Sequence, residues 1–260
     1  MSAPSRGSLT VVGTGIVLRA QVTPEADAAI ERADEVLFLV VDPLMAQWLE
    51  RRHPRSRSLD ALYAPGKRRS ETYREIVAAL LAPVRAGRDV CAVFYGHPGV
   101  FARPGHEAIR QARSEGFSAR MLPGVSALDC LVADLGLDPA ASGLQSYEAT
   151  DFVVHRRRPD TAAMLVLWQI GVVGEVAYVT EPRREHLHLL VERLRRFYRP
   201  DHETIVYEAS PYPDVADPLV LRVPLEALPE AEVPLLSTLV VPAARRPRRD
   251  RPVMERLGLA

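Results

Sequence analysis

Short apolar runs alternate with amphipathic stretches along most of the chain, and this alternation predicts an α/β fold. The runs are apolar throughout, as is typical of strands buried on both faces of a parallel sheet. The stretches between them repeat apolar residues with helical spacing. Strands are expected at Leu9–Val12, Val36–Val41, Val90–Phe94 and Ala119–Leu122, and in the second half at Met164–Trp168, Thr204–Tyr207, Leu219–Val223 and Ser237–Val241.

Helix boundaries are marked by capping residues and by proline and glycine. Thr23 followed by Pro24 is a typical helix start, because threonine caps the first turn and proline needs no N–H partner there. Ser126 is expected to begin another helix, and Gly136 to end it. Further helices are predicted around Leu44–Leu49, Arg69–Arg85, Pro104–Gly116 and Glu185–Arg196.

The chain is long enough for two α/β subdomains. Residues 138–146 are rich in small residues, which favours a connection between the subdomains. We therefore predict an N-terminal α/β subdomain over residues 1–125, a linker helix with its connection over 126–146, a C-terminal α/β subdomain over 147–243 and a tail over 244–260.

Composition excludes several function classes. The 33 basic and 33 acidic residues give zero formal net charge, which favours neither a nucleic acid nor a membrane partner. Cys91 and Cys130 lie in apolar stretches, so we expect reduced core thiols in a cytoplasmic protein. No metal site is expected, since His186 and His188 are two apart on a predicted helix and diverge. We find neither a signal peptide at the start nor an apolar run long enough to span a membrane.

Two glycine-bearing loops follow two of the predicted strands. The first loop contains Gly96 and Gly99, and the second contains Gly124. Small ligands bind beyond the carboxyl ends of strands in open α/β sheets, and glycine lets the backbone approach them closely. Each glycine taken alone is equally well explained as a turn residue. Two such loops in one α/β unit favour a binding site.

The segments around these loops resemble those of a known family. YGHPGVF (residues 95–101) and LPGVSALDC (residues 122–130) are similar to segments of the borosin peptide backbone α-N-methyltransferases, which belong to the tetrapyrrole (corrin/porphyrin) methylase superfamily. LYAPGKRRSETY (residues 62–73) and SYEATDF (residues 146–152) resemble the borosin branch in particular. One departure is Ile16, where tetrapyrrole methylases usually carry proline after the first glycine pair. The resemblance implies two α/β subdomains with a cofactor cleft between them.

The resemblance also implies S-adenosylmethionine as cofactor and a set of contact residues. We prefer His97 as a cofactor contact, although a general base is the competing interpretation. Gln169 and Thr238 taken singly are more readily explained as ordinary polar residues at the surface or at strand ends. The implied contacts are Tyr95, His97, Val100, Phe101, Ser126, Ala127, Gln169, Tyr207, Ala209, Ser237 and Thr238.

Methyl transfer to a backbone amide needs a base and a stabiliser of negative charge, because the amide lone pair is delocalised. Tyr63, Arg69 and Tyr73 match the borosin pattern of catalytic residues. We assign Tyr73 as base, Arg69 as charge stabiliser and Tyr63 as the residue that orients the amide. A nearby arginine is expected to lower the pKa of a tyrosine. Packing residues on an amphipathic helix are the alternative interpretation of the tyrosines.

The resemblance implies a homodimer and a peptide substrate. The chain ends soon after its last predicted strand, so we expect a split system in which the precursor peptide is a separate chain. One alternative function is methylation of a precorrin-like tetrapyrrole. The other is a non-catalytic module that binds peptide or S-adenosylmethionine.

Overall fold

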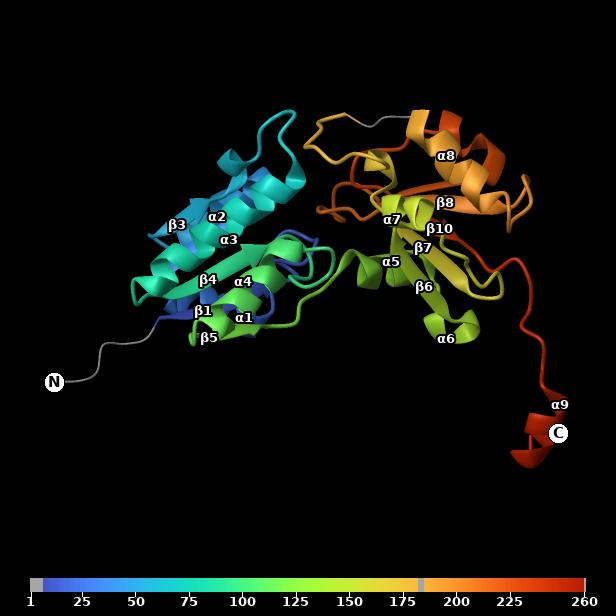
Figure 1. The fold of residues 1–260 in the computed structure, drawn as a ribbon, viewed down its shortest axis with the longest axis horizontal. Coiled ribbons are helices and arrows are strands. Elements are labelled where there is room, and N and C mark those ends of the chain that lie inside the picture. The colour runs from blue at the N-terminus through green and yellow to red at the C-terminus, as the bar shows by residue number, and fades with distance from the viewer. Residues whose placement is uncertain (1–6, 182–184, 260) are drawn as a thin grey trace. The chain divides into compact units, whose positions relative to one another are not determined.

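Five parallel strands form the first sheet in the order β3-β2-β4-β1-β5 (Figure 1). The structure is a computed structural model, and it describes residues 7–181 and 185–259. The apolar runs form the central strands, since these are covered on both faces. The strands are β1 (Ser8–Gly13), β2 (Glu35–Leu39), β3 (Ser56–Ser58), β4 (Asp89–Phe94) and β5 (Ser118–Met121).

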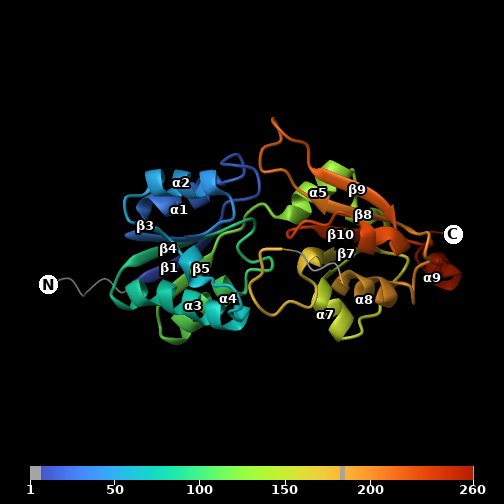
Figure 2. The same cartoon turned by 90° about the horizontal axis from the view of Figure 1, so that it is seen from above.

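Helices cover both faces of this sheet. Figure 2 shows α1 and α2 on one face and α3 and α4 on the other. Ile30 and Leu49 pack against strand residues on the first face, and Ile76 and Leu80 do so on the second. Each such fully buried side chain contributes about 2 kcal/mol of hydrophobic stabilisation. The bounds are α1 (Pro24–Arg32), α2 (Pro43–Arg52), η1 (Asp60–Leu62), α3 (Arg69–Arg85), α4 (Arg103–Ser114) and α5 (Ala127–Leu135).

The second sheet is mixed, with the order β6-β7-β10-β8-β9. Strand β10 runs antiparallel to both β7 and β8, while β6 and β7 are parallel. Its strands are β6 (Leu144–Glu148), β7 (Met164–Trp168), β8 (Glu203–Glu208), β9 (Leu219–Pro224) and β10 (Thr238–Val241). The remaining helices are α6 (Pro139–Ser142), α7 (Ala149–Val154), η2 (Ile170–Val172), α8 (Glu185–Leu194), η3 (Leu225–Glu230) and α9 (Arg251–Arg256).

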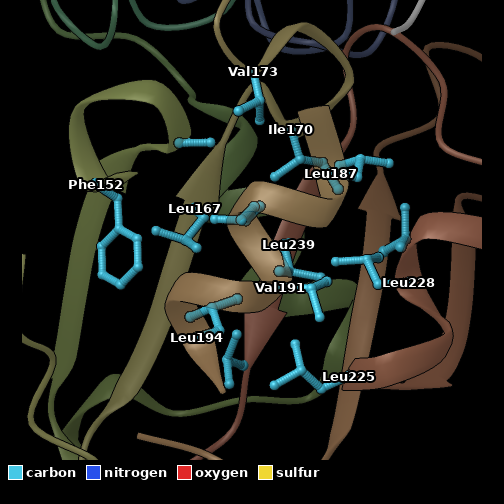
Figure 3. Packing of buried hydrophobic residues seen from close by; sticks show 14 of the residues in the cluster. Phe152, Leu167, Ile170, Val173, Leu187, Val191, Leu194, Leu225, Leu228 and Leu239 are labelled. Carbon is cyan, nitrogen blue, oxygen red and sulfur yellow. The ribbon is translucent and has the colours of Figure 1, made fainter. Parts of the chain in front are cut away.

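One apolar cluster joins this sheet to its helices. Leu167 and Leu239 of the sheet meet Leu187, Val191 and Leu194 of α8 (Figure 3). The spacing of the α8 residues puts them on one face, as the helical periodicity predicts.

The chain divides into two compact units. The first comprises residues up to Leu135 together with Val176–Val179 and Ala209–Pro218, and the second comprises the rest. The predicted α/β fold is confirmed. The predicted extents of the subdomains stay a prediction, but the connection holds more structure than its composition suggests. Asp138 caps α6 by accepting a hydrogen bond from the Ala140 N–H at 2.8 Å, and β6 begins soon after.

Candidate functional site

The loops after β1 and β4 are joined directly. Gly15 and Gly96 form an antiparallel bridge, in which the Gly96 N–H donates to the Gly15 carbonyl at 3.0 Å and the Gly15 N–H donates to the Gly96 carbonyl at 3.3 Å. A Cβ at Gly13 would lie 2.1 Å from the Gly96 oxygen, so only glycine fits there. Gly96 also has a left-handed φ of +67°. The sequence therefore needs glycine at these positions to bring the two strand ends together.

The loop after β4 uses its histidine to hold its own shape. The Gly99 N–H donates to His97 Nδ1 at 3.0 Å, and the Val100 N–H donates to the His97 carbonyl. Val100 and Phe101 follow and are 40% and 46% exposed. Two adjacent apolar side chains that are partly exposed in a loop after a strand suit an apolar ligand wall. Tyr95 begins this loop and is half-buried.

The second loop ends in a helix cap. Ser126 Oγ accepts from the Leu128 N–H at 3.1 Å, and the Ser126 N–H donates to an Asp129 carboxylate oxygen at 2.7 Å. The predicted cap at Ser126 is therefore confirmed, and α5 begins at Ala127. Because the hydroxyl is buried and already serves the cap, we expect the backbone of Ser126 and Ala127 to provide any ligand contact.

Tyr63, Arg69 and Tyr73 lie close together in the first unit. Tyr63 follows η1, and Arg69 begins α3 with Tyr73 one turn later. Both tyrosine rings are half-buried against the apolar cluster between α3 and the sheet. Burial, with the neighbouring Tyr73, raises the pKa of Tyr63 to about 12, and the Arg69 charge offsets this only in part. At neutral pH the Tyr63 hydroxyl therefore keeps its proton and can donate a hydrogen bond.

The expected lowering of a tyrosine pKa by a neighbouring arginine is present at Tyr63 but does not decide the net shift. Arg69 does act in that direction, but the loss of hydration around the half-buried ring has the larger effect. A neutral phenol at Tyr63 agrees with its predicted orienting role, since it can donate a hydrogen bond to a carbonyl oxygen.

Tyr178 was missed by the sequence analysis. Its ring lies against Tyr63, with centroids 5.2 Å apart and an interplanar angle of 54°. The segment that carries it, Val176–Val179, packs with the first unit although it follows β7 along the chain. No local sequence signal marks such a long-range contact.

The other predicted contacts gather at one edge of the second sheet. Strands β7 and β8 end at this edge and β10 begins there, with Thr238 opposite Tyr207. Gln169 has a left-handed φ of 60°, and the next residue, Ile170, donates its N–H to the Ser237 carbonyl at 3.1 Å. Tyr207, Ser237 and Thr238 are buried. Ala209 follows β8 and begins the second segment that packs with the first unit.

Glu208 is a further polar group at this edge that the sequence analysis did not select. It is half-buried, and burial raises the pKa of its carboxyl group. The Ser237 hydroxyl donates to Glu208 Oε2 at 3.4 Å and opposes this shift only in part. A half-buried carboxylate suits a cationic ligand group. The sequence signal that could have found Glu208 is an acidic residue directly after the predicted strand Thr204–Tyr207.

These features fit S-adenosylmethionine. The cofactor has an apolar adenine ring, cationic ammonium and sulfonium groups, and a carboxylate. The first unit offers partly exposed apolar side chains at Val100 and Phe101 and strand ends where glycine leaves no side chain in the way. The second unit, taken by itself, offers a half-buried carboxylate at Glu208. Within the described residues, no three His, Cys, Asp or Glu side chains are placed to hold a metal ion.

The comparison with known families agrees with this fold. The profile of the tetrapyrrole (corrin/porphyrin) methylases matches residues 8–227. The chain belongs to this family. Members of the tetrapyrrole methylase family are S-adenosylmethionine-dependent methyltransferases. None of the described helices is long and apolar enough to cross a membrane.

Solved structures show the same fold. This chain is similar to a uroporphyrin-III-C-methyltransferase from Thermus thermophilus, with a TM-score of 0.66. The match covers 92% of this chain and 93% of that one, at 24% identity. It is also similar to a diphthine synthase, with a TM-score of 0.62 and 18% identity over 97% and 94% of the two chains.

Two curated relatives carry names that join a methyltransferase to a peptide precursor. A relative from Coprinopsis marcescibilis, named as a methyltransferase/ribosomally synthesized type I borosin cyclic peptide precursor, is 40% identical over 92% of this chain. One from Omphalotus olearius, named as a methyltransferase/ribosomally synthesized cyclic peptide omphalotin A precursor, is 39% identical over 97% of it. The chain spans 63% and 62% of the length of these two relatives.

Proposed function

We propose that this protein transfers methyl groups from S-adenosylmethionine to backbone amide nitrogens of a ribosomally made peptide. The observation that carries the proposal is the group formed by Tyr63, Arg69 and Tyr73. Two phenols and a guanidinium side by side provide a base, a neutral hydrogen-bond donor and a fixed positive charge. Amide methylation needs these three functions. The names of the relatives, which join a methyltransferase to a peptide precursor, support the substrate class.

Each unit carries residues that would suit part of the cofactor. The first unit offers the backbone after β4 with the side chains of Val100 and Phe101, which suit an apolar group. The second unit offers Glu208 and the backbone around Gln169 and Ser237, which suit polar groups. When bound, the cofactor supplies an electrophilic methyl carbon.

Tyr63, Arg69 and Tyr73 would act on the peptide. The Tyr63 hydroxyl donates to the carbonyl oxygen of the amide that is to be methylated, and the Arg69 guanidinium stabilises negative charge on that oxygen. Tyr73 serves as the base that takes the amide proton. The nitrogen would then accept the methyl group that the bound cofactor supplies, and the electron pair of the carbon–sulfur bond would stay on sulfur.

A substrate comparison tests the proposal. The protein would be incubated with S-adenosylmethionine and, separately, with peptides encoded beside its gene and with a uroporphyrinogen-type tetrapyrrole, while release of S-adenosylhomocysteine is followed. We expect release with a peptide and none with the tetrapyrrole. Turnover of the tetrapyrrole alone would instead identify the alternative tetrapyrrole methylase.

The arrangement of the precursor is a separate question. A separate precursor chain and a homodimer both stay predictions, because the relatives' names describe methyltransferase and precursor together. The mass of the natural full-length chain, expressed alone, would show any methylation of the enzyme's own polypeptide. Methylation of an added peptide would show that the protein accepts a separate chain, and light scattering would give the oligomeric state.

A further inference from the structure

The segment Val176–Val179 is tied to the loop that precedes α3. The Arg69 N–H donates to the Val176 carbonyl at 3.0 Å, and the Tyr178 N–H donates to the Lys67 carbonyl at 3.1 Å. Between these bonds, Arg68 and Ala177 form an antiparallel bridge. The segment thus adds a short strand to the same residues that lead into Arg69. Its backbone position is fixed on both sides of Ala177.

This short pairing determines where the Tyr178 side chain lies. The ring meets the Tyr63 ring at 5.2 Å between centroids and at 54°, a tilted geometry that is favourable for aromatic pairs. Tyr178 also contributes to the electrostatic environment of the Tyr63 hydroxyl. The Tyr178 ring remains 38% exposed, so one side packs on Tyr63 and another faces solvent.

Tyr63 needs the support of the Tyr178 ring because the loop that follows Tyr63 is exposed. It is followed by Ala64, Pro65 and Gly66, which are exposed, and a Cβ at Gly66 would contact nothing within 4 Å. Lys67 restrains the loop at its base, where its ammonium donates to the Leu62 carbonyl at 2.7 Å. Tyr73 on α3 lies near enough to affect the Tyr63 hydroxyl electrostatically, and the Tyr178 ring packs against the Tyr63 ring itself.

We propose that Tyr178 is a positioning residue, which holds the Tyr63 ring so that its hydroxyl faces the peptide carbonyl. This inference rests on the proposed function, because it concerns the orientation of the substrate amide. The contact is made by the ring, so the Tyr178 hydroxyl is not required. Phenylalanine therefore preserves the function, whereas alanine removes it.

Kinetics of Tyr178→Ala and Tyr178→Phe test the role. We expect Tyr178→Ala to lower kcat about tenfold to a hundredfold, since small misplacements of reacting groups have effects of this size. The affinity for S-adenosylmethionine and the melting temperature are expected to stay within error of wild type. Tyr178→Phe is expected to restore kcat to within about twofold, and Val176→Ala, a change of an exposed side chain in the same segment, is the matched control.

A double substitution separates positioning from a general structural effect. If Tyr178 acts through Tyr63, then Tyr178→Ala costs less than about twofold in kcat when Tyr63→Phe has already removed the hydroxyl. Full additivity of the two effects would overturn the proposal. So would a Tyr178→Phe variant as slow as Tyr178→Ala.

A readout without turnover keeps this inference distinct from the proposed function. The ultraviolet absorbance of ionised tyrosine, taken as the difference between each protein and its Tyr63→Phe counterpart, follows Tyr63 alone. We expect its pKa of about 12 to fall in Tyr178→Ala, because the ring becomes better hydrated. An unchanged titration would overturn the ring contact. Absence of peptide methylation by wild type would instead overturn the proposed function, while the titration still decides the contact.

Discussion

Gly15 and Gly96 exchange both hydrogen bonds of an antiparallel bridge, and this pair joins the loops after β1 and β4. Beside it, Gly13 leaves no space for even one methyl group, since a Cβ would lie 2.1 Å from the Gly96 carbonyl oxygen and 2.7 Å from Pro98 Cδ. The proposed cofactor loop therefore has its shape set by backbone contacts that side chains would prevent.

Gly13→Ala is expected to destabilise the first unit strongly. The added methyl meets backbone, which cannot rotate away, so we expect a loss of about 3 kcal/mol and a fall in melting temperature on the order of 10 °C. Gly124→Ala is the matched control, because its Cβ would meet only ordinary contacts, at 3.4 Å from Pro98 Cδ and 3.6 Å from the Gly96 oxygen. Thermal unfolding followed by circular dichroism measures both. Equal melting temperatures for the two variants would contradict the steric argument.

Substitutions in the Tyr63 group are expected to slow turnover without weakening cofactor binding. Tyr73→Phe removes the proposed base, and a base in such a role contributes about 10² to 10⁴ in rate. Arg69→Lys keeps the charge but loses the planar donor fork, and we expect a decrease of about 10². Turnover with peptide and calorimetric binding of S-adenosylmethionine measure the two effects separately.

The control for these variants is Arg74→Lys, an exposed arginine on the same helix, which should leave kcat unchanged. A Tyr73→Phe enzyme with wild-type kcat would remove Tyr73 from the mechanism.

Glu208→Gln is expected to raise stability while it weakens cofactor binding. The pKa of this carboxyl group is raised by burial in the folded protein, so its ionisation costs stability as pH rises through that raised pKa. Glutamine removes the cost at neutral pH and gives no gain at acid pH, where the glutamate is already protonated. Melting temperatures at both pH values measure this difference.

Glu208→Gln is also expected to change the affinity for S-adenosylmethionine. If Glu208 contacts a cationic group of the cofactor, its loss weakens affinity about tenfold to a hundredfold, the effect of one charge-assisted hydrogen bond. Wild-type affinity is then also expected to fall as pH drops through the raised pKa. Glu203→Gln, at the exposed start of the same strand, loses only an exposed ion pair with Arg222, so the melting temperature should change little and the cofactor affinity not at all. Unchanged affinity in Glu208→Gln would place the cofactor elsewhere.

The thiols are expected to react slowly while the protein is folded. Burial raises the pKa of Cys91 to about 12, and burial also raises the pKa of Cys130, which lies nearer the surface. The thiolate is the reactive form, so a thiol reagent at neutral pH should modify Cys130 first and Cys91 only on unfolding. Rapid modification of Cys91 in the native protein would show that β4 is not buried as described.

Much of the fold could be predicted because buried parallel strands carry an unmistakable apolar signature. Val90–Phe94 and Met164–Trp168 are strands in the structure at or within a residue of the predicted bounds. Strand β3 was missed, since Ser56–Ser58 is a short polar edge strand. Strand β6 was missed for a related reason, because Leu144–Glu148 is only partly buried and has no apolar run.

Only the part of the site that is formed by residues close together in the sequence could be predicted. Tyr63, Arg69 and Tyr73 belong to one loop and the helix after it, so their proximity follows from short-range structure. Tyr178 reaches Tyr63 through a backbone pairing between segments far apart in the chain, which no local pattern encodes. Glu208 became visible only when the register of β8 and β10 placed it beside Ser237.

The position of the transferred methyl group tests the central claim most directly. A peptide that the protein methylates would be treated with S-adenosylmethionine carrying a deuterated methyl group, and fragmentation in the mass spectrometer would locate the label. The account predicts the label on backbone amide nitrogens, and its loss in Tyr73→Phe with cofactor binding retained. Label found only on side-chain atoms, or no label with any peptide while a tetrapyrrole is methylated, would contradict it.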